Sequence, residues 1–342
     1  MLRVDELTEE QVRALHDEHH MVSPIEQTPA WARYQASIEG REPWGWLGIY
    51  EDEQFLAYAL VIAYHTHGYT YLNVAHGPCW VNKPDEQRET QAFAALRTFV
   101  HSRDKSVVFV RLAAWNATLT RPVLSTIAYD STVVVDLHGG DEEILRRMQS
   151  RGRANVRKAL RESPAECADE TQRALLSFDE YYGVMVDTAQ RDGFTPAPAS
   201  TYASMLRELG PEHARLYVGR IDGVVSNWCL MTLNDNQAVY YYGCMSTAVR
   251  KLRAPDKLFY YAFCDLGRQG YDTLDMMGIG SPFCPQLNTL NQFKTKFAPK
   301  ITTIAPARDL PVRSHFYAAL VQAKALRAKL RTVLRRLKSQ AK

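Results

Sequence analysis

The sequence lacks the short motifs that mark the commonest kinds of enzyme active site. It contains no G-x-x-x-x-G-K-[ST] phosphate loop, no H-E-x-x-H zinc motif and no G-x-S-x-G nucleophile motif. The stretch "GIGSP" has too few glycines for a dinucleotide-binding turn, and the ten histidines are scattered along the chain. A covalent nucleophile, a bound metal and a redox cofactor are therefore not expected.

Cysteines and long apolar runs are also scarce. The six cysteines form no C-x-x-C pair, and several lie in apolar stretches, so we expect buried free thiols in a reducing cytosol. The longest apolar run, "FLAYALVIAY" at 55–64, is too short to cross a bilayer. The N-terminal stretch is charged and predicted helical, which is unlike a signal peptide. The sequence thus predicts a cytoplasmic protein.

The charge of the chain is unevenly distributed. The net charge is +3, but residues 308–342 carry ten Lys or Arg and a single acid, Asp309. Apolar positions within 314–338 step by three and four, as in a helix: Phe316, Ala319, Ala323, Leu326, Leu330, Val333 and Leu337. We expect this stripe to pack on the body of the protein and the basic face to meet an anionic partner. RNA and the inner face of a membrane are the alternatives for that partner.

Two blocks of the sequence share one order of expected elements, which is a β-meander, a helix and a strand. The first block has its meander within 44–80, its helix at 88–102 and its strand at 106–113. The second has its meander within 214–246, its helix at 256–269 and its strand at 271–279. The length of 342 residues also suggests about two domains. We therefore predict two copies of one α/β domain with mixed sheets, although chance similarity of two such units is the alternative.

The predicted domains are residues 1–143 and 144–305, followed by a basic amphipathic helix within 306–342. The second domain is predicted to open with one basic helix over 144–161, which has helical apolar spacing and no acid. Seven basic residues occupy its other positions: Arg146, Arg147, Arg151, Arg153, Arg157, Lys158 and Arg161. An ordinary solvated helix mixes both signs, so a phosphate-facing role and a plain surface role stay equally open.

Seven stretches of the sequence resemble, in order, motifs of the Fem family of tRNA-dependent aminoacyltransferases, which build the interpeptide bridge of bacterial peptidoglycan. They are "TPAWARYQ" (28–35), "AHGPCW" (75–80), "MQSRGRANVRKALR" (148–161), "VMVDTAQRDGF" (184–194), "YYYGCMS" (240–246), "LDMMGI" (274–279) and "NQFKTKF" (291–297). The resemblance implies two tandem GNAT-like domains without the coiled-coil insertion of some members. It also implies transfer of an amino acid from aminoacyl-tRNA, as co-substrate, to a UDP- or lipid-linked muropeptide. No other cofactor is implied, and a monomer is expected.

The same resemblance assigns the site residues. Lys294 would offset negative charge on the tetrahedral intermediate or hold the terminal RNA phosphate, and Phe293 would stack on the terminal adenosine or form a wall of the cleft. The positions that resemble the precursor-binding residues are Tyr202, Tyr241, Tyr242, Trp31, Arg33 and Gln35. The expected contacts to tRNA phosphates are Arg151, Arg153, Arg157, Lys158 and Lys296.

Three departures from the family pattern concern the precursor. The early lysine of the family aligns with Gln35, with Arg33 or Arg41 as other sources of charge. The arginine expected after "RDGF" is missing, and an aspartate sometimes proposed as the base falls near Leu112 or Ala113. These gaps leave open an amide-forming relative in secondary metabolism and an RNA-binding protein without catalysis. An acyl-CoA-dependent N-acyltransferase is a further alternative, which the missing Gly-rich pyrophosphate loop disfavours.

Overall fold

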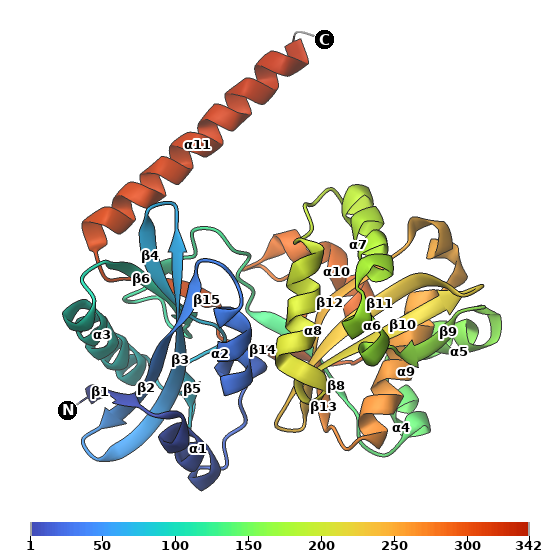
Figure 1. The fold of residues 1–342 in the computed structure, drawn as a ribbon, viewed down its shortest axis with the longest axis horizontal. Helices are drawn as coiled ribbons and strands as arrows, with labels where there is room; N and C mark the ends of the chain where they lie inside the picture. Colours follow the sequence, from blue (N-terminus) through green and yellow to red (C-terminus); the bar gives the residue numbers. More distant parts are fainter. Residues whose placement is uncertain (1, 341–342) are drawn as a thin grey trace. The chain divides into compact units, whose positions relative to one another are not determined.

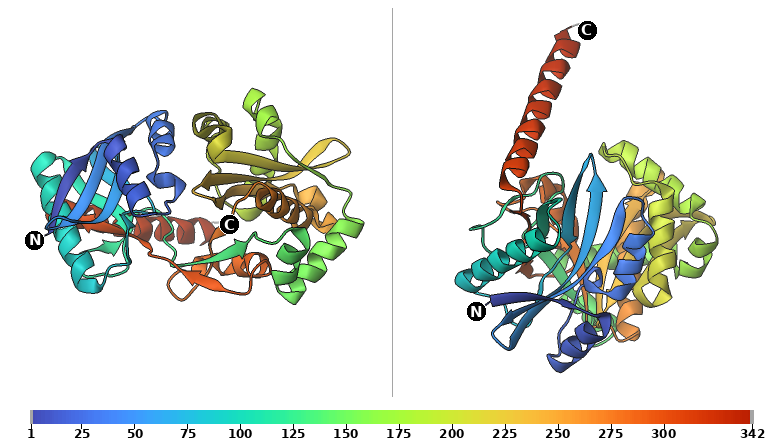
Figure 2. Two further views of the ribbon diagram at one scale, coloured as in Figure 1. Left: turned by 90° about the horizontal axis from the view of Figure 1, so that it is seen from below. Right: turned by 60° about the vertical axis from the view of Figure 1, so that its left-hand side comes forward.

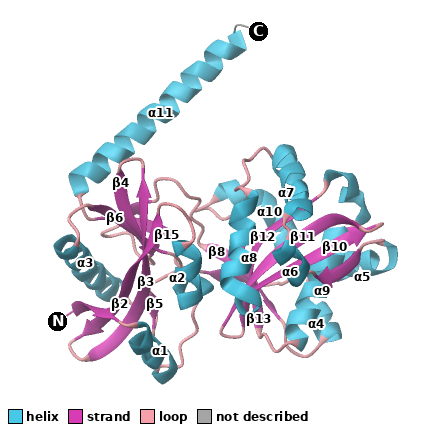
Figure 3. Ribbon diagram, viewed as in Figure 1, coloured by secondary structure: helices cyan, strands magenta, loops and turns pink. Residues whose placement is uncertain are grey.

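The computed structural model describes the backbone of residues 2–340 and the side chains of residues 2–327 and 330. The chain divides into two compact units, each built on one mixed sheet flanked by helices (Figures 1 and 3). Unit 1 contains residues 2–21, 40–128 and 305–340, and unit 2 contains residues 22–39 and 129–304. The predicted α/β class with two mixed sheets is confirmed.

Unit 1 has the strand order β1-β2-β3-β4-β6-β15-β7, and β5 pairs with β3. Its strands are β1 (Leu2–Leu7), β2 (Arg41–Glu51), β3 (Gln54–Thr66), β4 (Tyr69–Val74), β5 (Cys79–Trp80), β6 (Val107–Ala113), β7 (Arg121–Pro122) and β15 (Ala307–Pro311). Its helices are α1 (Glu9–Glu18), α3 (Glu86–Arg103) and α11 (Ser314–Gln340). The predicted apolar run forms the buried centre of β3. Helix α3 begins at Asp85, whose carboxylate accepts from the Arg88 N–H at 2.8 Å, and its apolar side packs on the sheet.

Unit 2 has the strand order β14-β8-β13-β12-β11-β10-β9. Its strands are β8 (Ser131–Asp136), β9 (Glu166–Asp169), β10 (Ala214–Ile221), β11 (Val224–Asn234), β12 (Gln237–Met245), β13 (Thr273–Gly278) and β14 (Ile301–Thr303). Its helices are α2 (Pro29–Ala36), α4 (Asp141–Arg147), α5 (Ser150–Glu162), α6 (Thr171–Leu176), α7 (Asp179–Asp192), α8 (Ala199–His213), α9 (Ala254–Arg268) and α10 (Asn288–Lys294), with short 3₁₀ turns η1 (Ile25–Gln27), η2 (Thr247–Leu252) and η3 (Pro285–Leu287). The predicted Asp222–Gly223 hairpin turn joins β10 to β11, and both residues have positive φ.

The two units repeat one arrangement of elements. Strands β2, β3 and β4 form an antiparallel meander, and after α3 the chain returns as β6, parallel to β4. In unit 2 the meander is β10, β11 and β12, and after α9 the chain returns as β13, parallel to β12. The shared order of meander, helix and parallel strand agrees with the predicted duplication.

Two segments lie in a different unit from the one predicted, and a third forms a strand where the C-terminal helix was predicted. Residues 22–39, with α2, belong to unit 2, where α2 packs on α8. Strand β8 precedes residue 143 but pairs with β13 and β14 of unit 2. Strand β15 lies after residue 305 and enters the sheet of unit 1 between β6 and β7. These pairings join segments far apart in the sequence, which local hydrophobic patterns do not encode.

The single basic helix predicted over 144–161 is wrong, because the chain forms two helices there. Met148 and Gln149 have ψ angles of 156° and 154°, so they are extended and separate α4 from α5. Arg146 also pairs with Glu143, three residues earlier in α4, at 2.6 Å, so part of its charge is neutralised locally. The continuous basic face is therefore shorter than the sequence suggested.

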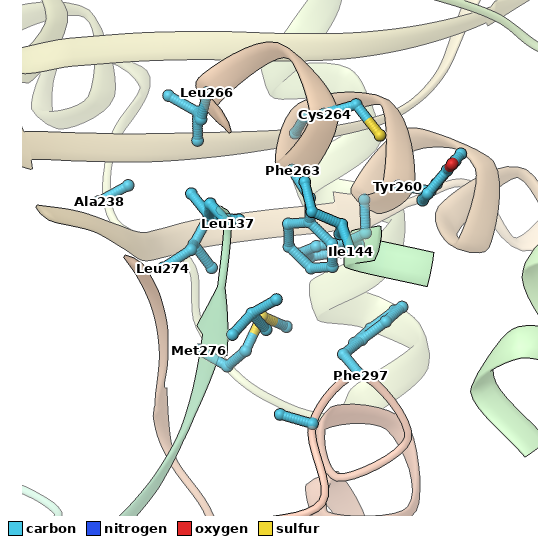
Figure 4. Packing of buried hydrophobic residues seen from close by; sticks show 14 of the residues in the cluster. Leu137, Ile144, Ala238, Tyr260, Phe263, Cys264, Leu266, Leu274, Met276 and Phe297 are labelled. Atoms are coloured by element: carbon cyan, nitrogen blue, oxygen red, sulfur yellow. The ribbon is translucent and has the colours of Figure 1, made fainter. Parts of the chain in front are cut away.

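The core of unit 2 lies between its sheet and α9. Phe263 of α9, Met276 of β13 and Phe297, which follows α10, lie together in this cluster (Figure 4). The α10 segment is therefore fixed to the main core by its aromatic side chains. All six cysteines are free thiols, and five of them are buried, as predicted.

The apolar stripe of α11 was predicted to pack on the protein, and in its described part this is wrong beyond the first turns. Tyr317 is buried against Phe109, but Leu326 and Leu330 are 60% and 53% exposed. The helix continues without a break to Gln340 (Figure 2). Within residues 2–340, no helix is both long enough and apolar enough to cross a membrane.

Candidate active site

Lys294 lies buried at the end of α10. It is 6% exposed, its Nζ donates a hydrogen bond to the Gly278 oxygen at 2.9 Å, and the ring of Tyr240 lies 5.8 Å away. Burial lowers the pKa of Lys294 to about 8, and the Asp275 carboxylate opposes that shift by favouring the charged form. An amine with this pKa exists in both protonation states near neutral pH, so it can donate a proton as well as stabilise negative charge.

Burial of Lys294 makes stability dependent on pH. Below about pH 8 the lysine is charged in the folded and unfolded states, and the folded state bears the cost of desolvation. Between pH 8 and about 10.4 the folded protein releases this proton before the unfolded chain does, so the cost disappears. We expect the free energy of unfolding of the wild type to rise over this range, relative to Lys294→Met, by about 3 kcal/mol. Urea unfolding of both proteins across the range measures the difference, and a constant difference would contradict a lowered pKa.

Phe293 and Lys296 lie on either side of Lys294 in the sequence, and the side chains of both make contacts inside unit 2. Phe293 makes edge contacts with Phe259 and Phe297, at ring-centroid distances of 5.2 and 5.4 Å. The Lys296 ammonium is buried, pairs with Asp256 and lies 4.3 Å from the centre of the Phe293 ring. Burial lowers the pKa of Lys296, and Asp256 opposes the shift. Lys296 was predicted to contact tRNA, but its ammonium is already paired with Asp256 inside unit 2.

The first turn of α5 touches the backbone of this same segment. The Gln149 N–H donates to the Lys296 oxygen at 3.1 Å, and a Cβ placed on Gly152 would lie 2.0 Å from that oxygen. Only glycine allows this approach, because the obstacle is main chain and cannot rotate away. The glycine of the basic stretch therefore fixes α5 against the Phe-Lys-x-Lys-Phe segment.

We expect Gly152→Ala to destabilise the protein by about 1–3 kcal/mol, because the added methyl forces α5 away from Lys296. Gly183→Ala is the matched control, since Gly183 lies in helix α7 and its added Cβ would meet nothing within 4 Å. That substitution should stabilise the protein by up to about 1 kcal/mol through helix propensity. Urea unfolding compares them, and equal gains at both positions would show that the close approach at Gly152 is wrong.

Asp275 lies near Lys294, and a group formed by Tyr129, Glu26 and Tyr241 continues from it. Sequence reasoning assigned a role to only one of these four residues, Tyr241. Asp275 accepts from the Met277 N–H at 2.6 Å, and its charge raises the pKa of Tyr129 further, although burial is the main cause. Burial also raises the pKa of Tyr241, which shares a hydrogen bond with the carboxylate of Glu26, itself 4% exposed. Glu26, Tyr129 and Asp275 were missed. Only Asp275 carried a signal, because it lies in the quoted "LDMMGI" stretch.

The tyrosines and the tryptophan predicted to bind precursor form one series of ring contacts in unit 2. Trp31 lies 5.8 Å from Tyr241, Tyr241 lies 5.2 Å from Tyr242, and Tyr242 lies 5.0 Å from Tyr202. Tyr202 is 2% exposed and also stacks on Phe178, so its ring is part of the core. The structure thus brings these four predicted residues together.

Helix α2 carries the other two predicted precursor-binding residues, which differ in exposure. It begins at Thr28, whose hydroxyl accepts from the Trp31 N–H at 3.2 Å, with Pro29 in its first turn. Gln35 is buried, whereas Arg33 on the same helix is exposed. Of the two, only Arg33 can present a positive charge to a ligand from solvent.

The basic residues of α5 also differ in their exposure to solvent and in the contacts that they already make. Arg151, Arg157 and Lys158 are exposed, and Lys158 lies 3.7 Å from Glu162 one turn along. Arg153 instead donates hydrogen bonds to main-chain oxygens of α4 and of the break between the helices. Arg153 therefore has a local structural role, and its tRNA contact stays a prediction.

The "VMVDTAQRDGF" stretch (184–194) makes hydrogen bonds to the end of β12 and to the turn that follows it. Thr188 and Arg191 both donate to the Met245 oxygen, at 2.9 and 2.8 Å, and Asp187 accepts from the Thr247 N–H at 2.6 Å. Gly193 ends α7 with a φ of +74°. This stretch therefore positions the strand that carries Tyr240, Tyr241 and Tyr242.

Comparisons with known proteins agree with this architecture. Residues 150–283 match the acetyltransferase (GNAT) domain family model, whereas no curated protein matches the chain. The crystal structure of FemX superposes with a TM-score of 0.72 at 14% identity, covering 93% of this chain and 99% of FemX. The structure of L-PGS from Bacillus licheniformis gives a TM-score of 0.52 at 13% identity, covering 94% and 97% of the two chains. A tandem GNAT protein from the clavulanic acid biosynthesis pathway also gives 0.52, at 8% identity, covering 91% and 99%.

At these identities the structural matches establish a shared fold. They confirm the Fem-like architecture that the motifs predicted, and the domain match in unit 2 agrees with it. The chain therefore has the tandem GNAT-like fold of FemX, and residues 150–283 within it match an acetyltransferase (GNAT) domain model.

Proposed function

We propose that the protein transfers an amino acid from aminoacyl-tRNA to the free amine of a peptidoglycan precursor. The observation that carries the proposal is the convergence of six of the seven Fem-like stretches within unit 2. Within this unit the first turn of α5 contacts the Lys296 oxygen, and Lys294 at the end of α10 bonds to the Gly278 oxygen of β13 and lies 5.8 Å from the Tyr240 ring of β12. A buried amine in the middle of these stretches has no evident need in a purely structural core.

The reaction requires little covalent help from the protein. The amine nitrogen attacks the carbonyl carbon of the aminoacyl ester, the C–N bond forms, and the C–O bond to the ribose breaks. The amine loses a proton and the ribose oxygen gains one. Lys294, with a pKa of about 8, can stabilise the oxyanion and supply the proton to the ribose oxygen. Positioning of the two substrates would supply much of the remaining acceleration.

The amine must also lose its proton to an acceptor. In the family pattern an aspartate falls near Leu112 or Ala113, and neither can accept a proton. Glu26 and Asp275 are carboxylates beside the Tyr241 and Lys294 side chains, and we propose them as the candidates for this role. The aromatic series from Trp31 to Tyr202 is the proposed wall for the precursor.

The tRNA is proposed to contact α5 through its exposed cations. Arg151, Arg157 and Lys158 are exposed to solvent, so their charges can reach phosphates, and the only ion pair that they make with a described residue is the exposed Lys158–Glu162 pair. Such contacts would give an affinity that falls steeply with salt concentration.

A transfer assay tests the proposal. Purified protein is mixed with radiolabelled aminoacyl-tRNA pools and with UDP-linked or lipid-linked muropeptide, with phosphatidylglycerol as a third acceptor. Label on a muropeptide that disappears after RNase treatment supports the proposal. Label on phosphatidylglycerol would instead assign a lipid acceptor. Binding of tRNA with no transfer to any acceptor would leave an RNA-binding protein.

A second candidate function is acyl-CoA-dependent N-acylation, which the acetyltransferase (GNAT) match over 150–283 favours. The absence of a Gly-rich pyrophosphate loop from the sequence argues against it, and the turn before α9 carries Arg253, with a φ of +56°, rather than glycine. Transfer from labelled acetyl-CoA, unaffected by RNase, would establish this candidate. An aminoacyl-tRNA enzyme that uses a small amine of secondary metabolism would show RNase-sensitive transfer to that amine and none to muropeptides.

A further inference from the structure

The described part of α11 leaves an apolar side uncovered. Its first turns are held on unit 1 through Tyr317, and the Lys324 ammonium donates to the Leu124 oxygen. Beyond that point, Leu326 and Leu330 are 60% and 53% exposed. Being four residues apart on a helix, these two leucines lie on the same side. In the sequence, the same spacing continues through Val333 to Leu337.

The charge that accompanies this stripe is of one sign. From Arg313 to Lys342 the sequence has nine Lys or Arg and no acid. Lys324 and Arg327 are exposed on the turns that carry the leucines. A long helix that is basic, has an apolar stripe and is too polar to cross a bilayer has the properties of a helix that lies in a membrane surface.

We propose that α11 docks the protein on a membrane rich in anionic phospholipid. The leucines enter the boundary between headgroups and acyl chains, and the lysines and arginines pair with lipid phosphates. A second copy of the helix would place like charges against one another, and RNA would cover the charges but leave the leucines in water. An anionic lipid surface satisfies both features. The inference concerns where the enzyme acts and does not depend on which reaction it catalyses.

Vesicle flotation of the full-length protein tests the inference. We expect binding to vesicles of equal parts phosphatidylglycerol and phosphatidylcholine to be at least about tenfold tighter than binding to phosphatidylcholine alone. Raising the salt concentration should weaken it. Leu326→Ser combined with Leu330→Ser should lower the affinity by about tenfold or more, because the apolar contribution is lost.

The matched control is Leu176→Ser, which removes an 88% exposed leucine from α6 of unit 2 and should leave binding unchanged. Equal binding to both kinds of vesicle, or a double variant that binds like the wild type, would overturn the proposal. Sedimentation of the wild type as a dimer that the double variant dissociates would assign the stripe to self-association. If tRNA that carries no amino acid displaced the protein from vesicles, and the double variant still bound that tRNA, the basic face would be assigned to RNA.

Discussion

Lys294→Met is expected to lower kcat for aminoacyl transfer by about 100- to 1000-fold, the usual cost of removing one preorganised donor from the transition state. Methionine keeps the length and apolar stem of lysine but has no ammonium group. The loss should fall mainly on kcat, because the buried amine is placed to meet charge that develops during the reaction. Single-turnover transfer from aminoacyl-tRNA measures it directly.

The folded state should tolerate this change. Lys294 makes one hydrogen bond to the Gly278 oxygen, and its depressed pKa shows that burial of the charge opposes folding. Lys294→Met should therefore be at least as stable as the wild type at neutral pH. Lys300→Met is the control, since Lys300 lies six residues away in an exposed position and should keep full activity. Wild-type rates in Lys294→Met, with normal tRNA binding, would remove Lys294 from the site.

Lys294 and Phe293 were predicted as the centre of the candidate site because the alternation of Phe and Lys is a local signal, whereas the groups around them were not predicted. Glu26, Tyr129 and Asp275 come from three distant parts of the chain, and nothing in their own neighbourhoods indicates that they meet. Such a cluster depends on strand pairing between β8, β13 and β12, which a single sequence does not report.

The local elements of the fold were predictable because each has its own periodicity or turn chemistry. The meanders, α3, α9 and the strands that follow them were recognised in this way. The membership of β8 and β15 in their sheets was not, since it follows from long-range pairing. The break between α4 and α5 was missed because Met148 keeps helical spacing while its backbone is extended. Helical spacing alone therefore cannot locate a change of direction.

A buried ion pair joins strand β15 to its neighbour β6 in unit 1, and we expect its removal to cause a large loss of stability. Asp309 on β15 accepts from the Arg111 guanidinium on β6 at 2.8 and 3.1 Å, and their side chains are 0% and 6% exposed. The same carboxylate accepts from the Leu124 N–H at 3.0 Å and from the Tyr317 hydroxyl at 3.1 Å. One carboxylate thus links β6, β15, the loop after β7 and the start of α11.

Asp309→Ala is expected to destabilise the protein by about 3–5 kcal/mol, because it leaves the Arg111 charge buried without its partner. Urea unfolding measures the loss. Arg111→Met combined with Asp309→Leu should recover most of it, since the unpaired charge is removed as well. Glu9→Ala is the control, because the Glu9–Arg13 pair is exposed and should contribute at most about 1 kcal/mol. If Asp309→Ala cost no more than Glu9→Ala, the buried pair would not be what holds β15 in place, and the return of the chain to unit 1 would depend on backbone pairing with β6 and β7.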